Sequence, residues 1–306
     1  MVGKLIKKLL SSKLKKIFLS EFEKGLMLKA KKISFINSKK KIIKNLSEIE
    51  FKVFSQWGED GIIDWILSKN KKIPKIFLEI GTEDYSEANT RFLLQDKNWK
   101  GYLIEGNKLF SDKIKKRDIY WKYDLSVFNY FVNSSNINKY LEKIGIPNRI
   151  GLLSLDVDSI DYWIIKELKN INPAIIICEF NPIFGIKERV SVPDKKRFIR
   201  NDEHYSNLYY GASIRAYQQL LKKKNYIFLG TNSAGNNAFF INKDFSKNIV
   251  NAISNKKIFI SKFKESRNKF NKLTYLSKKD SLKLIKNKFV FDFKSKKIRK
   301  IAEINI

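Results

Sequence analysis

Cysteine and histidine are almost absent from the sequence. Its 306 residues include one cysteine, Cys178, and one histidine, His204. A single cysteine excludes an internal disulfide and fits a reducing compartment. Without a cluster of cysteines and histidines, the sequence offers no typical zinc site. We expect Cys178 to lie buried in a strand as a small hydrophobic residue.

Long apolar runs are absent as well. No stretch of about 18 or more residues is apolar throughout, which excludes a membrane-spanning helix. The N-terminus is basic but has no unbroken apolar core and no small-residue cleavage site, so we expect no signal peptide. These absences predict a cytoplasmic protein.

Acidic residues are scarce relative to basic ones, and the imbalance is concentrated at the two ends. The chain has 62 Lys and Arg against 31 Asp and Glu, a formal charge of +31. Residues 1–50 carry +10 of this charge, residues 246–306 carry +14, and residues 51–245 carry +7. The pattern predicts a central domain, 51–245, between two basic helical extensions, 1–50 and 246–306.

The basic extensions have two readings. They can attract phosphate-rich partners or an anionic membrane, which would place the protein peripherally at the inner face of the membrane. Alternatively, lysine is simply the default surface residue of this chain. Residues 1–32 show leucines near helical spacing, and such a helix can lie on a membrane or pack on the domain. Residues 33–50 are predicted to be a linker.

The central domain alternates short apolar runs with amphipathic segments. This alternation predicts a Rossmann-like α/β fold, with a doubly wound, mostly parallel seven-stranded sheet whose last strand is antiparallel. Hydrophobic residues make up 43% of the chain, enough to fill such a core. The expected strands are 76–81, 101–107, 119–123, 150–155, 173–180, 226–230 and 238–241.

The stretch around the first strand resembles the start of a ligand-binding βαβ unit. Gly81 follows the buried run and permits a sharp turn and a close approach to a ligand. Glu79 lies at the carboxyl edge of the sheet, where open α/β folds bind ligands. Glu105 ends the second strand, 24 residues after Gly81. A carboxylate near this spacing can accept hydrogen bonds from ribose hydroxyls.

Four successive predicted strands end in acids: Glu79, Glu105, Asp124 and Asp156. Such a row is hard to explain by packing, since carboxylates are seldom buried without partners. It would repel a dinucleotide pyrophosphate. It suits a ligand with hydroxyls, an adenine amine and a positive centre, and S-adenosylmethionine has all three.

Two further segments are candidates for loops over a site. Residues 54–61 contain Gln56 and two acids before an apolar helix, which suits either a helix cap or a ligand lid. Residues 183–208 have no clear period, and a loop this long in a compact domain is usually functional. It contains His204.

These residues resemble the FkbM-like family of class I S-adenosylmethionine-dependent methyltransferases. The resemblance covers roughly residues 51–245. It rests on SQWGEDGI (55–62), FLEIGTEDYSEANTRFLL (77–94), GYLIEGN (101–107), LLSLDVDSIDYWI (152–164), CEFNP (178–182), HYSNLYYGAS (204–213) and NSAGNNAFF (232–240).

The resemblance implies a role for each matching position. Glu79, Gly81 and Thr82 would lie near the methionine part of the cofactor, with Gln56 also among the cofactor contacts. Glu105 would bind the ribose, Asp124 would lie beside the adenine, and Asp156 would lie near the methyl group and the acceptor. The family has a glycine-rich loop where this chain has only Gly81, which leaves open a domain that does not bind the cofactor.

The resemblance further implies O-methylation, with a sugar or polysaccharide hydroxyl as acceptor. A hydroxyl needs a base or a metal to become a good nucleophile. His204 is a candidate base, because unperturbed histidine titrates at about 6.5. Alternatively, Asp156, Asp158 and Glu179 could hold Mg²⁺. Asp158 and Asp161 could equally be helix caps.

Two other functions remain open. Asp156-Val157-Asp158 could hold a metal and a nucleotide sugar in a glycosyltransferase. The basic extensions could belong to a non-catalytic protein that binds RNA or membranes. No RNA-binding motif or aromatic platform is visible, so we do not expect a nucleic-acid partner.

Overall fold

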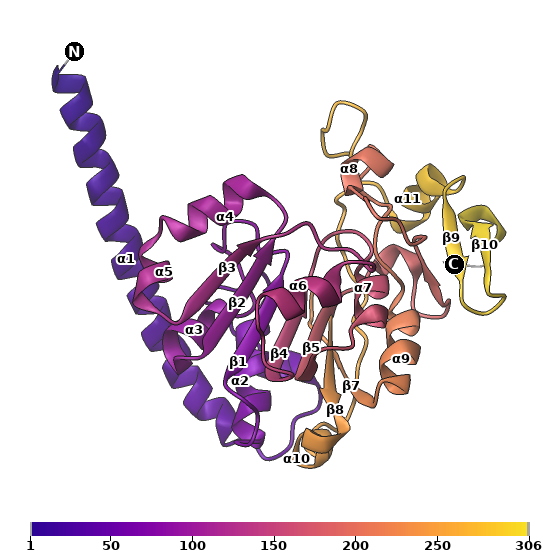
Figure 1. Cartoon of the computed structure of the whole chain (residues 1–306), viewed down its shortest axis with the longest axis horizontal. Coiled ribbons are helices and arrows are strands. Elements are labelled where there is room, and N and C mark those ends of the chain that lie inside the picture. Colours follow the sequence, from indigo (N-terminus) through magenta and orange to yellow (C-terminus); the bar gives the residue numbers. More distant parts are fainter. Residues whose placement is uncertain (1, 305–306) are drawn as a thin grey trace.

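The computed structural model describes residues 2–304, with the side chains of residues 14, 17 and 20–304. Its centre is a seven-stranded sheet in the order β3-β2-β1-β4-β5-β8-β7 (Figure 1). Its strands are β1 (Ile76–Ile80), β2 (Lys100–Glu105), β3 (Leu125–Asn129), β4 (Arg149–Leu155), β5 (Asn172–Glu179), β7 (Tyr226–Thr231) and β8 (Asn237–Asn242).

The pairing of the strands confirms the predicted fold class. The neighbours β1, β2, β3, β4 and β5 pair in parallel. The last strand of this sheet in sequence order, β8, lies between β5 and β7 and is antiparallel to both. The fold is therefore a Rossmann-like, doubly wound sheet. Cys178 is buried in β5, as predicted.

Helices cover both faces of the sheet because alternate strand residues point to opposite sides. Leu78 and Ile80 belong to the core under α6 (Ile137–Lys143), α7 (Asp161–Glu167) and α9 (Ile214–Lys223). Phe77 points to the other core. That core lies under α2 (Glu59–Lys69), α3 (Arg91–Lys97), α4 (Lys108–Lys115), α5 (Asp118–Lys122) and α10 (Lys247–Val250).

The N-terminal extension is a single helix, α1 (Val2–Ser38), which runs along one side of the domain (Figure 1). Its C-terminal part packs on the domain through Ala30 and Asn37, both buried. Leu14 and Ile17, nearer its start, are exposed. The helix enters the predicted linker 33–50, whose later residues are also packed, since Leu46 and Ile49 are buried.

The predicted third strand, 119–123, is wrong. These residues lie mostly in the short helix α5, and the strand β3 begins only at Leu125. The reason is the pattern of burial. In the run 119–123 only Ile119 is buried, and Trp121 is 72% exposed. Leu125 and Val127 show the alternation that a half-buried strand requires.

The C-terminal extension is helical only in part. It contains α10 and α11 (Lys278–Ile285), and then the hairpin β9 (Phe289–Asp292) and β10 (Lys297–Lys300). Strand β9 also pairs with the short strand β6 (Val190–Ser191), which gives a second sheet of three strands. This small sheet lies at the opposite end of the molecule from α1 (Figure 1).

None of the helices in the described part of the chain is long and apolar enough to cross a membrane.

Gly81 is a position where the fold tolerates no side chain. Its φ is +81°, and a Cβ there would lie 1.6 Å from the carbonyl oxygen of Asp156. We expect Gly81→Ala to lower the free energy of unfolding by more than about 3 kcal/mol, because backbone cannot move aside as a flexible side chain can. Urea unfolding followed by tryptophan fluorescence measures the loss.

The matched control is Gly145→Ala. Gly145 has a φ of +65°, but a Cβ there would meet nothing within 4 Å. The free energy of unfolding of the control variant should therefore fall only by the cost of a left-handed backbone at alanine, about 1 kcal/mol. Equal losses in the two variants would contradict the steric argument.

Candidate functional site

The candidate site lies at the carboxyl edge of the seven-stranded sheet. There the chain leaves β1 toward β2 on one side and leaves β4 toward β5 on the other, so the switch point lies between β1 and β4. Open α/β sheets bind ligands at this place. Four strand ends near this edge carry acids: Glu79, Glu105, Asp156 and Glu179.

Gly81 brings the loops after β1 and β4 together. Its N–H donates to the carbonyl of Ile104 on β2 at 3.0 Å, and the N–H of Asp156 donates to the carbonyl of Ile80 at 3.0 Å. Because Gly81 has no side chain, the backbone of Asp156 can pass directly against it. The glycine is therefore required for the close approach of these two loops.

Glu79 is buried and its carboxylate faces the start of α3. It accepts hydrogen bonds from the Asn89 N–H at 3.0 Å, the Thr90 N–H at 3.3 Å and the Thr90 hydroxyl at 2.5 Å. Burial raises the pKa of Glu79 to about 7, although these donors oppose the shift. In this structure Glu79 organises the loop before α3.

Glu105 binds the loop that follows Gly81. Its Oε2 accepts from the N–H groups of Thr82 at 3.0 Å and Glu83 at 2.8 Å, and its Oε1 accepts from Asn107 N–H at 2.7 Å. Burial raises the pKa of Glu105. A carboxylate oxygen has two lone pairs, so Oε1 keeps one acceptor position. Within the described part of the chain, the buried hydroxyl of Thr82 has no hydrogen-bond partner.

Asp124 lies at the opposite edge of the sheet, so its prediction as a residue beside the adenine is wrong. It immediately precedes β3, its carbonyl accepts from Gly101 N–H at the start of β2, and its exposed carboxylate lies 3.6 Å from Lys100 Nζ. The error follows from the misplaced third strand. The carboxyl end of β3 is Asn129, whose amide donates to the carbonyl of Glu105 at 2.8 Å.

The segment 54–61 is a braced turn. The Asp60 carboxylate accepts from the N–H groups of Val53, Phe54 and Ser55, and burial raises its pKa to about 6. Its neighbour Glu59 binds the backbone of this turn and two asparagine amides, Asn232 and Asn237. Gln56 has an exposed side chain. The two acids thus have structural roles.

The carboxylates of Asp156, Asp158 and Glu179 converge. One oxygen from each lies within 4.8 Å of the others. Burial raises the pKa of Asp156 and of Glu179 well above the ordinary values, and the neighbouring carboxylates add to both shifts. Such a group can take up a proton or hold a hard divalent cation. We call these three residues the carboxylate cluster.

Arg200 supplies positive charge beside the cluster. It donates to the Asp158 carboxylate and lies 3.1 Å from Glu265 Oε2, and its guanidinium lies 3.7 Å from the ring centroid of Tyr210. Burial opposes its charge, but Tyr210 and the two carboxylates raise its pKa above the ordinary value. Asn181 holds the adjoining loop by donating to the carbonyls of Leu208 and Tyr210.

Asp161 is structural. It begins α7 and accepts from the N–H groups of Val157 at 2.9 Å and Ser159 at 3.0 Å, which fixes the loop that carries Asp156 and Asp158. Burial raises its pKa to about 6. The structure contradicts the capping alternative for Asp161, because Ile160 is the N-cap of α7 and no side chain caps this helix. Asp158 instead has a left-handed backbone, with φ of 54°.

His204 lies at the end of a short helix, α8 (Arg200–Glu203). Its Nδ1 is 2.7 Å from the Ser206 hydroxyl, and its ring stacks on Tyr205. Burial lowers its pKa, as does the nearby charge of Lys288. Among the described residues, no hydrogen bond or ion pair joins His204 to the carboxylate cluster.

The acids at the sheet edge therefore do not face one common space. Glu79 faces α3, and Glu105 faces the loop after Gly81. Only the carboxylate cluster converges. Arg200 and Glu265 were missed from the sequence. Arg200 lies in the long loop predicted to be functional, whereas nothing marks Glu265 in the basic C-terminal extension as a neighbour of the site.

The residues at the switch point fit part of an adenosyl group. Glu105 keeps one acceptor position on Oε1, and Thr82, whose N–H donates to Glu105 Oε2, has an unpartnered hydroxyl among the described residues; both could bind ribose hydroxyls. The carboxylate cluster lies on the other side of Gly81, against the loop after β4. Together these groups can bind a polyhydroxyl ligand and accept a proton from it.

Comparison with known proteins gives distant structural matches. A SAM-dependent methyltransferase from Aquifex aeolicus aligns with 11% identity and a TM-score of 0.33, over 55% of this chain and 81% of that one. The N-terminal domain of EvdMO1 with SAH bound aligns with 7% identity and a TM-score of 0.38, over 60% and 79%. The CurJ carbon methyltransferase aligns with 12% identity and a TM-score of 0.38, over 60% and 53%.

No family model matches the chain, and no curated protein matches it. Similarity as distant as that of the three structures does not carry a function from one chain to another. The FkbM-like assignment stays a prediction.

The buried carboxylate of Glu79 predicts a pH effect on stability. Its pKa is raised from 4.5 to about 7, so the native state holds this proton more tightly than the unfolded state does. The stabilisation is complete below the unfolded pKa and is lost as the pH rises through about 7. Relative to Glu79→Gln, the wild type should lose on the order of 3 kcal/mol of unfolding free energy across this interval.

Urea unfolding of both proteins from about pH 4 to about pH 8 tests this expectation. Glu142→Gln, at an exposed position, controls for the loss of one negative charge. Parallel stability profiles for the wild type and Glu79→Gln would show that Glu79 does not titrate as described.

Proposed function

We propose that the chain is an S-adenosylmethionine-dependent O-methyltransferase that acts on a sugar or polysaccharide hydroxyl. The observation that carries the proposal is the pairing of Glu105 with Thr82 at the switch point of the sheet. Glu105 keeps one free acceptor position, and the buried Thr82 hydroxyl lacks a partner. A buried polar group without a partner is costly unless a ligand satisfies it.

The roles of the residues follow from their positions. Glu105 and Thr82 would bind the ribose hydroxyls, and the peptide of Gly81 would lie beside the methionine part. Bound S-adenosylmethionine supplies a methyl group on a positively charged sulfur. The carboxylate cluster would bind the acceptor, because Asp156 directly abuts Gly81 through its backbone. A neutral polyhydroxyl acceptor suits this acidic edge better than an anionic one.

Two groups are candidates for the base. Asp156 belongs to the carboxylate cluster at the switch point. His204 lies beside Lys288, which disfavours the positive charge that a histidine base acquires. We therefore assign proton transfer to Asp156, with Glu179 sharing the proton, and keep His204 as the alternative to be tested.

The cofactor assignment predicts that S-adenosylhomocysteine binds and raises the melting temperature. Calorimetric titration of Glu105→Ala should show about 100-fold weaker affinity, because a hydrogen bond to a buried carboxylate is lost. Glu83→Ala is the control, since Glu83 is the exposed acid of the same loop and should retain the affinity. Unchanged affinity in Glu105→Ala would count against methyl transfer.

A glycosyltransferase is the second candidate, because the carboxylate cluster has the spacing of a cation site. The same thermal measurement separates the two functions. Stabilisation by UDP with Mn²⁺, and none by S-adenosylhomocysteine, would favour sugar transfer and overturn the proposal.

The choice of base predicts different kinetics for two variants. Asp156→Asn should reduce kcat by about 100-fold or more, because it removes the group that accepts the hydroxyl proton. His204→Ala should leave kcat within about two-fold of the wild type if histidine is not the base. The opposite result would assign the base to His204. Cofactor affinity, measured by calorimetry, serves as the control for folding in both variants.

The same assay tests Mg²⁺. Asp156, Asp158 and Glu179 would hold the ion, which would lower the pKa of the acceptor hydroxyl. If the ion takes part, chelation with EDTA should abolish turnover, and added Mg²⁺ should restore it in the wild type but not in Asp158→Asn. Turnover that EDTA leaves unchanged would assign proton transfer to the carboxylates alone.

A further inference from the structure

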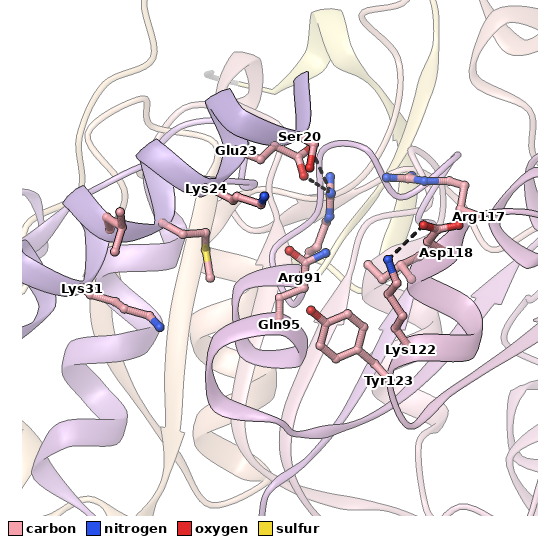
Figure 2. Close-up of a pocket in the computed structure, with 13 residues that line it drawn as sticks. Ser20, Glu23, Lys24, Lys31, Arg91, Gln95, Arg117, Asp118, Lys122 and Tyr123 are labelled. Atoms are coloured by element: carbon pink, nitrogen blue, oxygen red, sulfur yellow. Dashed lines mark hydrogen bonds and ion pairs between the residues drawn. The ribbon is translucent and has the colours of Figure 1, made fainter. Parts of the chain in front are cut away.

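A cavity of about 760 Å³ lies between α1, α3 and α5. No residue of the carboxylate cluster is among the described residues that line it. Figure 2 shows α1 on one side of this cavity and the residues of α3 and α5 on the other. We call it the α1–α5 groove. A cavity of this size accommodates a ligand of drug-like dimensions, well beyond a single small ion.

The α1–α5 groove is basic, and its acids are engaged. Among the residues whose side chains the structure describes, five basic and two acidic ones line it. Glu23 accepts two 3.0 Å contacts from Arg91 Nη2, and Asp118 lies 2.9 Å from Lys122 Nζ. Lys24 also pairs with Glu21 at 2.6 Å and Lys31 with Asp96 at 3.2 Å, so Arg117 is the lining cation that has no carboxylate partner among the described residues. The basic residues are Lys24, Lys31, Arg91, Arg117 and Lys122.

Two arginines in the groove reinforce the positive field. The side chain of Arg91 is only 6% exposed, and its Nε has no hydrogen-bond partner among the side chains and backbone that the structure describes. Arg117 donates to the carbonyl of Asp84 at 2.7 Å, and in the described part of the chain it makes no ion pair with a carboxylate. Burial lowers the pKa of Arg117, and the like charge of Arg91 lowers it further. In Figure 2 both guanidinium groups extend toward the same region.

Two like-charged guanidinium groups beside a basic cavity are typical of an anion site, because a bound anion relieves their repulsion. The rest of the lining includes apolar surface from Met27, Leu28 and Ile119. We propose that the α1–α5 groove binds a phosphate ester whose phosphate lies between Lys24, Arg91 and Arg117. The organic part of the ester lies against the apolar surface. This site is independent of the methyl-transfer proposal.

The phosphate ester can come from solution or from a lipid. Exposed apolar side chains of α1 lie at Leu14 and Ile17, N-terminal to Lys24 on the same helix. If a lipid headgroup occupied the groove, these side chains of α1 could contact the surface of the membrane that contains the lipid. A soluble phosphate ester needs only the groove.

Binding measurements with two probes test the proposal and identify the source. Calorimetry with glycerol 3-phosphate tests a soluble ester. Sedimentation with vesicles of phosphatidylcholine, with and without phosphatidic acid, tests a lipid headgroup. We expect at least one probe to bind, with an affinity that falls as the salt concentration rises. Arg117→Gln and Lys24→Gln should each weaken that binding by about ten-fold or more.

Matched variants distinguish binding in the groove from attraction of the probe to the positive charge of the whole protein. Lys29→Gln removes an exposed charge of α1 outside the groove, and Arg149→Gln removes an exposed arginine at the start of β4. Both should bind the probe as the wild type does. Lys24 is 66% exposed, so its variant tests the site without disturbing the core.

Each outcome decides the proposal. Glycerol 3-phosphate binding that depends on Arg117 and Lys24 supports a soluble ligand. Binding only to vesicles with phosphatidic acid, with the same dependence, supports a lipid ligand. Failure of both probes to bind overturns the proposal. It is equally overturned if Lys29→Gln and Arg149→Gln weaken binding as much as the groove variants do.

Discussion

The close passage of two backbone segments at Gly81 is the constraint on which the candidate site depends. The loop after β1 and the loop after β4 meet there with no side chain between them. On one side, this contact places the amides of Thr82 and Glu83 on the Glu105 carboxylate. On the other, it fixes the start of the loop that carries Asp156 and Asp158. The backbone contact at Gly81 thus positions the acidic side chains of the site.

Acidic and basic residues gather in different parts of the molecule. The chain carries a formal charge of +31, yet acids dominate the carboxyl edge of the sheet. Backbone N–H groups donate hydrogen bonds to Glu79 and Glu105, and Arg200 forms an ion pair with Asp158 of the carboxylate cluster. The basic excess gathers instead on the extensions and in the α1–α5 groove. An anionic ligand would be repelled by the sheet edge and attracted to the groove.

Much of the fold was predictable because buried strands leave a strong pattern. The runs at β1, β2, β4 and β5 are apolar and each ends in or next to an acid, so their positions and their shared edge follow from the sequence. The aromatic run 119–123 has similar residue types but only one buried side chain. Its composition therefore predicted a strand where the structure has a helix. The C-terminal hairpin was missed since alternating lysines and apolar residues suit helices and strands alike.

The sequence by itself identified most of the acids at the carboxyl edge of the sheet, because strand ends and their acids are local features, but it misplaced Asp124. It therefore identified Glu79, Glu105 and Asp156 and marked the loop that contains Arg200. Only the tertiary structure decided where each carboxylate points, since that depends on neighbours distant in sequence. Glu79 turns to α3, Glu105 turns to the loop of Thr82, and Glu179 joins Asp156 and Asp158. The α1–α5 groove is likewise decided by the tertiary structure, because it forms where the N-terminal helix α1 packs against α3 and α5.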